Sequence, residues 1–296
     1  MGLGPAAVKL NLELWQRGLF REVKSVGEIG SQELHLPLAD FEALVRAAGL
    51  PLARRERFSN LSNWPRHPRC SSKPFYELLG AERYTSFDLN RELGALPLDL
   101  NRPLEDRSLY GQFDLVTDYG CNEHAFNIGE AYRTMHRLCK PQGLMVILQA
   151  VYGGNGYYQF DLPFFEGLAA ANRYAVLFSS YIISTKDERG DARQFHIPLS
   201  RELLRALDWS KVTEIGISYV FQRQADADFE YPYQGSYLSE RQQHDGYQLQ
   251  FLPAPPSPSH TYLPVRGPTV EDTRTAHLVR TVCRRAIKKA KGLVRV

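Results

Sequence analysis

The stretch Lys24-Ser25-Val26-Gly27-Glu28-Ile29-Gly30-Ser31-Gln32-Glu33 decides how this chain is expected to fold. Its first half is β-prone and ends in the acid Glu28, and the spacer Ile29 and then Gly30 follow. That order places a carboxylate and a bare backbone turn at the carboxyl end of a strand, where open α/β sheets bind their ligands. A second run, Tyr84-Thr85-Ser86-Phe87-Asp88-Leu89-Asn90, also reads as a strand that ends in an acid.

Helical and extended segments alternate outward from this stretch. Apolar residues at three- and four-residue spacing predict helices over residues 6–20, 37–48, 74–79, 128–138 and 201–209. β-prone runs predict strands over residues 22–29, 83–87, 96–100, 113–119, 144–151, 174–185 and 211–223. The polar residues 52–73 are expected to form an ordered insertion, because Phe58, Leu61 and Trp64 give it apolar groups to bury. Crossover helices return a chain in parallel, so we expect a doubly wound α/β sheet.

Composition bounds the kind of protein that this is. The chain has 296 residues, of which 43% are hydrophobic, and that is enough to bury a substantial core. The formal net charge is +3, but residues 270–296 hold eight Lys or Arg against two acids, so the remainder is net negative. The globular part is therefore not expected to bind nucleic acid.

Cysteine spacing and hydropathy indicate the compartment. Cys70, Cys121, Cys139 and Cys283 form no CxxC or Cys/His pattern, so neither a disulfide framework nor a metal site is expected. The first residues lack the pattern of a signal peptide, and no apolar run is long enough to cross a membrane. We expect a soluble, cytoplasmic protein with a domain at 1–225, a Tyr/Pro-rich extension and linker at 226–269 and a basic helix at 270–296.

Five segments together resemble the class I S-adenosylmethionine-dependent methyltransferases, over about residues 22–224. They are Val26-Gly27-Glu28-Ile29-Gly30, Phe87-Asp88-Leu89-Asn90, Leu96-Pro97-Leu98-Asp99-Leu100-Asn101, Phe113-Asp114-Leu115-Val116-Thr117 with Glu123-His124 beyond it, and Leu138-Cys139-Lys140-Pro141-Gln142-Gly143-Leu144-Met145-Val146-Ile147. The resemblance implies a mostly parallel, Rossmann-like sheet with an antiparallel last strand. It also implies S-adenosylmethionine as the cofactor.

The resemblance assigns the cofactor residues one by one. In the family, the first acid and the glycine turn hold the methionine end, which here would be Glu28, Gly30 and Ser31. The acid that ends the second strand takes the ribose hydroxyls, a role for Asp88 beside Leu89 and Asn90. Asp99 and Leu100 stand where the family contacts the adenine, and Tyr119 completes the expected set. The chain departs from the family at Gln32 and Leu34, which stand at the places of the second and third glycines.

Candidate catalytic and acceptor residues follow the fourth and fifth strands. Methyl transfer often needs a base beside the acceptor, and His124 with Glu123 comes directly after the fourth strand. A histidine that packs on the following helix is the alternative. The loop after the fifth strand is aromatic and glycine-hinged, and its side chains could stack on a small molecule or glycan. The expected acceptor residues are Tyr152, Asn155, Tyr157, Tyr158 and, less directly, His196.

The C-terminal segment has an amphipathic pattern. Over residues 273–294 small apolar residues recur on one stripe and basic residues fill the rest. This pattern suits the surface of an anionic membrane, where a lipid-linked sugar would be an acceptor, and it equally suits a helix docked on its own domain. Two functions follow from the sequence: an S-adenosylmethionine-dependent O- or N-methyltransferase, or a non-catalytic binding protein on the same fold.

Overall fold

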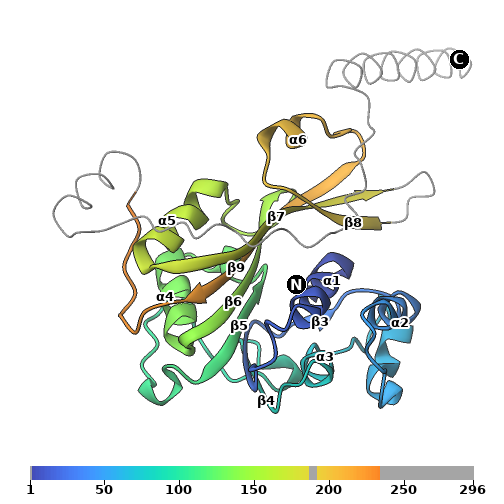
Figure 1. Cartoon of the computed structure of the whole chain (residues 1–296), viewed down its shortest axis with the longest axis horizontal. Helices are drawn as coiled ribbons and strands as arrows, with labels where there is room; N and C mark the ends of the chain where they lie inside the picture. Colours follow the sequence, from blue (N-terminus) through green and yellow to red (C-terminus); the bar gives the residue numbers. More distant parts are fainter. Residues whose placement is uncertain (1, 187–191, 234–296) are drawn as a thin grey trace, which may run out of the picture.

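A computed structural model describes residues 2–186 and 192–233 of the chain (Figure 1). Its centre is a seven-stranded sheet in the order β4-β2-β5-β6-β9-β7-β8. The strands, in chain order, are β2 (Ser25–Ile29), β4 (Arg83–Phe87), β5 (Phe113–Tyr119), β6 (Cys139–Tyr152), β7 (Tyr174–Lys186), β8 (Ala192–Ile197) and β9 (Val212–Arg223).

The directions of the strands confirm the predicted fold class. Strands β4, β2, β5 and β6 are parallel neighbours. The last strand, β9, lies between β6 and β7 and is antiparallel to both. In register, Ile29 of β2 stands beside Phe87 of β4 and Asp118 of β5, so the three strands end together at one edge of the sheet.

Helices cover both faces of the sheet, as Figure 1 shows. One face carries α1 (Pro5–Gln16), α2 (Leu38–Ala47), the 3-10 segment η1 (Arg55–Asn63) and α3 (Lys73–Leu78). The other carries α4 (Ile128–Leu138) and α5 (Leu162–Asn172). Each side has its own apolar core: Val26 and Leu115 face the first group of helices, while Ile29 and Val116 face the second. This two-sided burial is what a doubly wound sheet requires.

Several elements differ from the prediction. Residues 96–100 form no strand and only a single bridge from Leu96 to Phe87, because Pro97 has no N–H to extend a ladder. Helix α5 and strand β8 were not predicted at all. A short strand β3 (Glu33–Leu34) follows the glycine turn and pairs with β1 (Gly2–Leu3). The predicted excursion over 201–209 is helical only in α6 (Arg201–Arg205).

The compact domain continues past the expected boundary at residue 225. Phe229 is buried in the core beside α4 and α5. His136 of α4 hydrogen-bonds the Ala227 carbonyl at 2.9 Å, and the Glu230 N–H donates to Asn172 of α5. The expected linker from residue 234 onward and the basic helix at 270–296 lie outside the described residues.

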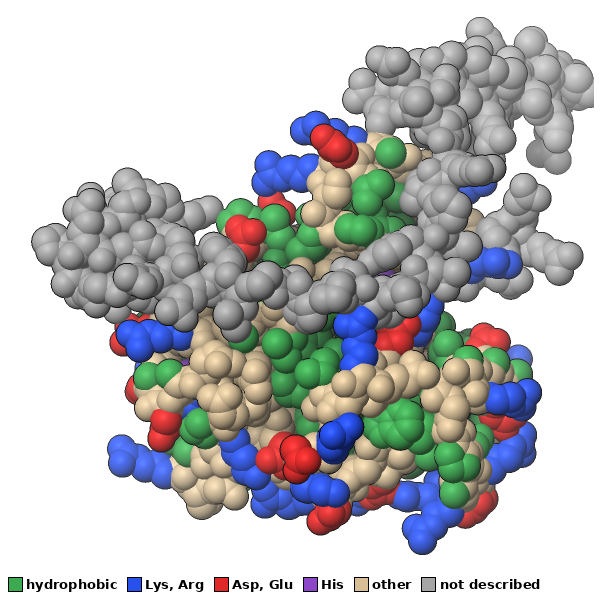
Figure 2. Space-filling model, viewed as in Figure 1, with side chains coloured by type: hydrophobic (Ala, Val, Ile, Leu, Met, Phe, Trp, Pro, Cys, Tyr) green, Lys and Arg blue, Asp and Glu red, His purple; other side chains and the backbone are tan. Residues whose placement is uncertain are grey.

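Two features of the described part bear on partners. None of the helices in residues 2–186 and 192–233 has the length and apolar character that a membrane crossing needs. Acidic and basic side chains alternate over the face seen in Figure 2, where the described residues form no continuous basic patch.

Candidate cofactor and acceptor site

The glycine turn after β2 is held between the ends of β4 and β5. Gly30 has φ +88° and donates its N–H to the Phe87 carbonyl at 2.7 Å. A Cβ on Gly30 would lie 3.1 Å from the Cys121 sulfur and 2.8 Å from the side-chain amide nitrogen (Nε2) of Gln32. The positive φ favours glycine here, and any larger residue would also have to displace the Gln32 side chain. The turn therefore lies at the edge where a ligand is expected.

Asp88 ties this turn to the end of β4. Its two carboxylate oxygens accept the N–H of Ser31 at 2.9 Å and that of Asn90 at 3.1 Å. The Ser31 hydroxyl also bonds the Asn90 side chain at 2.7 Å. Each oxygen of Asp88 keeps a second lone pair, so the half-buried carboxylate can still accept two ribose hydroxyls. Leu89 beside it is exposed.

Glu28 lies under the turn and is fully buried, which differs from the expected contact with the cofactor. Its carboxylate accepts the hydroxyls of Ser72 and Tyr84, and more weakly that of Thr117 at 3.4 Å. Burial raises the pKa of Glu28 to about 7, although these hydroxyls act in the opposite direction. The Glu28 side chain points toward the start of α3, so its hydrogen bonds link the end of β2 to the residues that pack beneath the glycine turn.

Tyr119 is also placed inside, on the same face of the sheet. It is 2% exposed, and its hydroxyl accepts a hydrogen bond from the Asn11 amide of α1. A residue packed against α1 cannot reach a ligand at the strand ends. The expected contact of Tyr119 with the cofactor is therefore replaced by a role in attaching α1.

The two residues that stand in place of glycines point into the protein. Gln32 is 1% exposed, and its amide donates to the Ile29 carbonyl at 2.9 Å. Leu34 is fully buried in β3. Neither side chain projects outward from the turn. The β1–β3 strand pair directly follows the turn, and it directs these side chains inward.

The segment after β4 that holds Asp99 and Leu100, the expected adenine contacts, is a loop. Asp99 accepts the Asn101 N–H at 2.9 Å and pairs with Arg102 at 3.2 Å. Leu100 is half-buried against the core beside α4. Asn101 in turn bonds Asn127, which caps α4. Asp99 and Leu100 are thus held close to α4 although their segment is not a strand.

An acid and a histidine come together after β5. One oxygen of Glu123 accepts the Ala150 N–H at 2.9 Å, and the other lies 3.6 Å from Nε2 of His124. The Glu123 side chain is 7% exposed and that of His124 is 36% exposed. Burial raises the pKa of Glu123. In the expected catalytic pair, the carboxylate of Glu123 is therefore buried and the imidazole of His124 is accessible to solvent.

Asp118, which the sequence reading did not single out, fixes the turn that carries this pair. Its carboxylate accepts the N–H groups of Cys121 at 2.8 Å and Asn122 at 3.2 Å, and it also bonds the Gln149 amide of β6. Burial raises the pKa of Asp118 to about 7. The sequence did offer a signal for this role, because Asp118 stands at the end of an otherwise apolar strand.

The aromatic loop after β6 packs on the Glu123–His124 turn. The Tyr157 N–H donates to the Glu123 carbonyl at 2.8 Å, and the Tyr158 hydroxyl donates to that of Phe126 at 2.6 Å. A Cβ on Gly156 would come within 2.7 Å of Glu123, so the close approach needs glycine. Tyr157 and Phe126 meet edge to face at 5.8 Å, yet both are more than 70% exposed.

A second aromatic pair lies on the other side of the loop. Tyr152 meets Trp209 edge to face at 5.6 Å, and both are partly exposed. In the same loop, a Cβ on Gly154 would lie 3.5 Å from a carboxylate oxygen of Glu123, and one on Gly153 would lie 3.1 Å from the backbone Cα of Glu214. Partial burial raises the pKa of Glu214, and the Glu123 charge adds to the rise. Asn155 is exposed in this loop. Phe126, Trp209 and Glu214 are candidate site residues that the sequence did not predict.

His196 does not join this site. It is 5% exposed, and its ring nitrogens bond the Ser180 hydroxyl at 2.7 Å and the Ala6 carbonyl at 3.0 Å. His196 therefore attaches α1 to β7 and β8. The structure does not place it among the expected acceptor residues, which corrects the prediction. In the part of the chain that the structure describes, no three His, Cys, Asp or Glu side chains cluster as metal ligands would.

Comparison with protein-family models and with curated proteins finds no match. Solved structures do match. The 1,6-didemethyltoxoflavin-N1-methyltransferase of Burkholderia thailandensis, with bound 1,6-didemethyltoxoflavin and S-adenosylhomocysteine, is 13% identical over 74% of this chain and 79% of that one, with a TM-score of 0.40. An SAM-dependent methyltransferase from Archaeoglobus fulgidus is 11% identical over 73% and 94%, with a TM-score of 0.36. A putative methyltransferase from Bacillus halodurans is 8% identical over 73% and 99%, with a TM-score of 0.38. At this level of similarity the likeness concerns the fold alone.

Proposed function

We propose that this chain is an S-adenosylmethionine-dependent methyltransferase, with the cofactor at the joined ends of β2 and β4. One observation carries the proposal: the Gly30 turn and the Asp88 carboxylate are tied together by the Ser31 N–H, next to the turn that presents Glu123 and His124. A backbone turn that favours glycine and an acid with free lone pairs both suit a nucleoside with a charged amino-acid end.

The residues after β5 would handle the proton of the acceptor. Bound S-adenosylmethionine would supply a methyl group on a positively charged sulfur. His124 is accessible and would accept the acceptor's proton, while Glu123 behind it would stabilise the imidazolium that forms. Asp118 would hold the turn in place through the Cys121 and Asn122 N–H groups.

The acceptor that we propose is a small molecule bound between the two aromatic pairs. Exposed Phe126 and Tyr157 on one side, and Tyr152 with Trp209 on the other, offer ring faces and edges for stacking. A polyhydroxylated sugar is compatible with such a surface, so a glycan or a lipid-linked sugar is a narrower form of the same proposal. Transfer of labelled methyl into separated small-molecule, glycan and lipid fractions distinguishes them.

Asp88 gives the sharpest test of the cofactor site. Asp88→Ala should weaken S-adenosylmethionine binding by about 10- to 100-fold, since hydrogen bonds to a charged group contribute about 1.5–3 kcal/mol. Asp88→Asn is the matched control, because its side-chain oxygen still accepts the Ser31 N–H, and it should lose less. Calorimetric titration measures both. An unchanged affinity in folded Asp88→Ala protein would refute the assignment, and no binding by the unaltered chain would favour a non-catalytic binding protein.

For the basic segment 270–296 we propose, from its sequence alone, contact with an anionic membrane by a cytoplasmic enzyme. Each basic residue near such a surface contributes about 1 kcal/mol. Deleting these residues should abolish sedimentation with vesicles rich in phosphatidylserine and leave cofactor binding unchanged. If the intact chain shows no binding to these vesicles, the proposal fails.

A further inference from the structure

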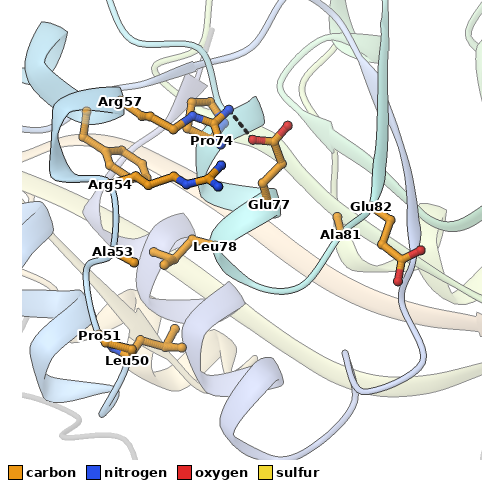
Figure 3. A pocket seen from close by; sticks show the side chains of 11 residues that line it. Leu50, Pro51, Ala53, Arg54, Arg57, Pro74, Glu77, Leu78, Ala81 and Glu82 are labelled. Atoms are coloured by element: carbon orange, nitrogen blue, oxygen red, sulfur yellow. Dashed lines mark ion pairs between the residues drawn. The ribbon is translucent and has the colours of Figure 1, made fainter.

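A cavity of about 650 Å³ lies beside α3, next to the residues that directly precede β4 (Figure 3). Its walls are mostly apolar: Leu50 and Pro51 come from the segment after α2, and Pro74 and Leu78 come from α3. The volume lies within the range of small-molecule sites, which combine apolar walls with a few polar groups. The proposed cofactor and acceptor residues do not line it, so it is a separate site.

Four charged side chains line the cavity: Arg54, Arg57, Glu77 and Glu82. Glu82 is paired at 3.2 Å with Lys24, which does not line the cavity. Arg57 is paired with Glu77, as the dashed line in Figure 3 marks. Its neighbour Arg55 is paired with Glu42 on α2. Within residues 2–186 and 192–233, Arg54 has no ion pair, and Figure 3 shows its side chain extending from the same segment as Arg57 toward α3. A guanidinium beside apolar walls suits a carboxylate with a hydrocarbon body, because the planar group can donate two parallel hydrogen bonds to it.

Helix α3 connects this cavity to the glycine turn. Pro74, Glu77 and Leu78 face the cavity. Ser72, the residue before the helix, donates its hydroxyl to the Glu28 carboxylate two residues before Gly30. Since α3 has only six residues, a ligand that presses on one side of it would also move the Ser72 end.

We propose that this cavity binds a small amphipathic carboxylate through Arg54, and that α3 transmits its occupancy to the glycine turn through Ser72 and Glu28. The binding step is independent of the proposed methyltransferase activity. The transmitted effect concerns the turn itself and can be measured without cofactor.

Sodium octanoate and octylammonium chloride are the probes, because they share a hydrocarbon chain and differ in the sign of the charge. Calorimetry on the full chain should show binding of octanoate at least tenfold tighter than that of octylammonium. Arg54→Ala should weaken octanoate binding at least tenfold, and Arg54→Lys should weaken it less. Arg46→Ala, which removes an exposed arginine of α2 outside the cavity, should leave it unchanged. Equal binding of both probes, or full binding by Arg54→Ala, would overturn the site.

Hydrogen exchange tests the transmission. The Gly30 and Ser31 amides are both hydrogen-bonded, so their exchange reports how well the turn is held. Saturating octanoate should change their exchange rates at least twofold in the unaltered chain and leave them unchanged in Arg54→Ala. Octanoate binding with unchanged exchange at these two amides would overturn the coupling.

Discussion

The turns after β2 and β5 lie at the same edge of the sheet, but their acids are held differently. Glu28 is fully buried, and three hydroxyls occupy its carboxylate. Glu123 has one oxygen on the Ala150 N–H and the other beside an accessible His124. The first arrangement fixes the shape of a turn, whereas the second leaves a proton acceptor within reach of a ligand. The comparison therefore separates a rigid half, where we propose the cofactor, from a half with an accessible imidazole, where we propose the acceptor.

The largest effect should come from the half with the accessible imidazole. His124→Ala should lower methyl transfer by about 10²- to 10⁴-fold, the usual contribution of a positioned base. The affinity for S-adenosylmethionine should stay within about twofold, because His124 lies after β5 and outside the glycine turn. Labelled methyl transfer into a small-molecule extract, together with calorimetry, measures both. Full activity in this variant would show that His124 only packs on the protein surface.

In the rigid half, substitution of Glu28 should mainly lower the free energy of unfolding. Glu28→Ala leaves the hydroxyls of Ser72 and Tyr84 buried without their acceptor, so we expect the free energy of unfolding to fall by about 2–4 kcal/mol. Glu28→Gln keeps the shape and one acceptor oxygen, and it should cost less. Urea unfolding measures both, and a loss below about 0.5 kcal/mol for Glu28→Ala would contradict the buried network.

How far the sequence predicts this fold depends on the element. Strands 83–87 and 113–119 are predicted at their observed bounds because breakers flank two continuous β-prone runs. Helix α5 escaped because Phe164 and Phe165 follow one another before a run of alanines, so it has no clear polar face to give a helical period.

The direction of Glu28 could not be predicted either. Its partners Ser72 and Thr117 stand 44 and 89 residues away in the chain, and only the folded sheet brings them together. Position at a strand end was enough to predict that Gly30, Asp88 and the Glu123–His124 turn lie at one edge of the sheet, but it does not say which face a side chain takes. Trp209 and Glu214 likewise join the acceptor side through the pairing of β9 with β6.

The pH dependence of stability sharpens the comparison. Burial raises the pKa of Glu28 from 4.5 to about 7, so between these values the folded chain binds more protons than the unfolded chain. The free energy of unfolding should therefore fall as pH rises from about 4.5 to 7, by about 1–3 kcal/mol for this group. Burial raises the pKa of Asp118 as well, so its titration also lowers the free energy of unfolding as the pH rises. Urea unfolding at several pH values should show a shallower fall in Glu28→Gln, and equal slopes would argue against a neutral, buried Glu28.

The smallest stability effect should come from the exposed aromatic residues. Phe126→Ala and Tyr157→Ala remove side chains that are 73% and 72% exposed, so each should change the free energy of unfolding by at most about 0.5 kcal/mol. Phe160→Ala, which removes a buried ring of the same loop, is the control and should cost about 3–5 kcal/mol. A large loss for the exposed pair would mean that the rings close the fold and do not form an acceptor surface.

Photo-crosslinking of labelled S-adenosylmethionine to the intact chain, followed by peptide mapping, tests the central claim most directly. The proposed cofactor site lies at the Gly30 turn and the Asp88 strand end, and the turn after β5 lies directly beside it. The label should therefore appear in peptides that contain residues 25–32, 84–90 or 118–124, and excess S-adenosylhomocysteine should remove it. Label that resists this competition, or that lies only in peptides outside these three segments, would contradict the account.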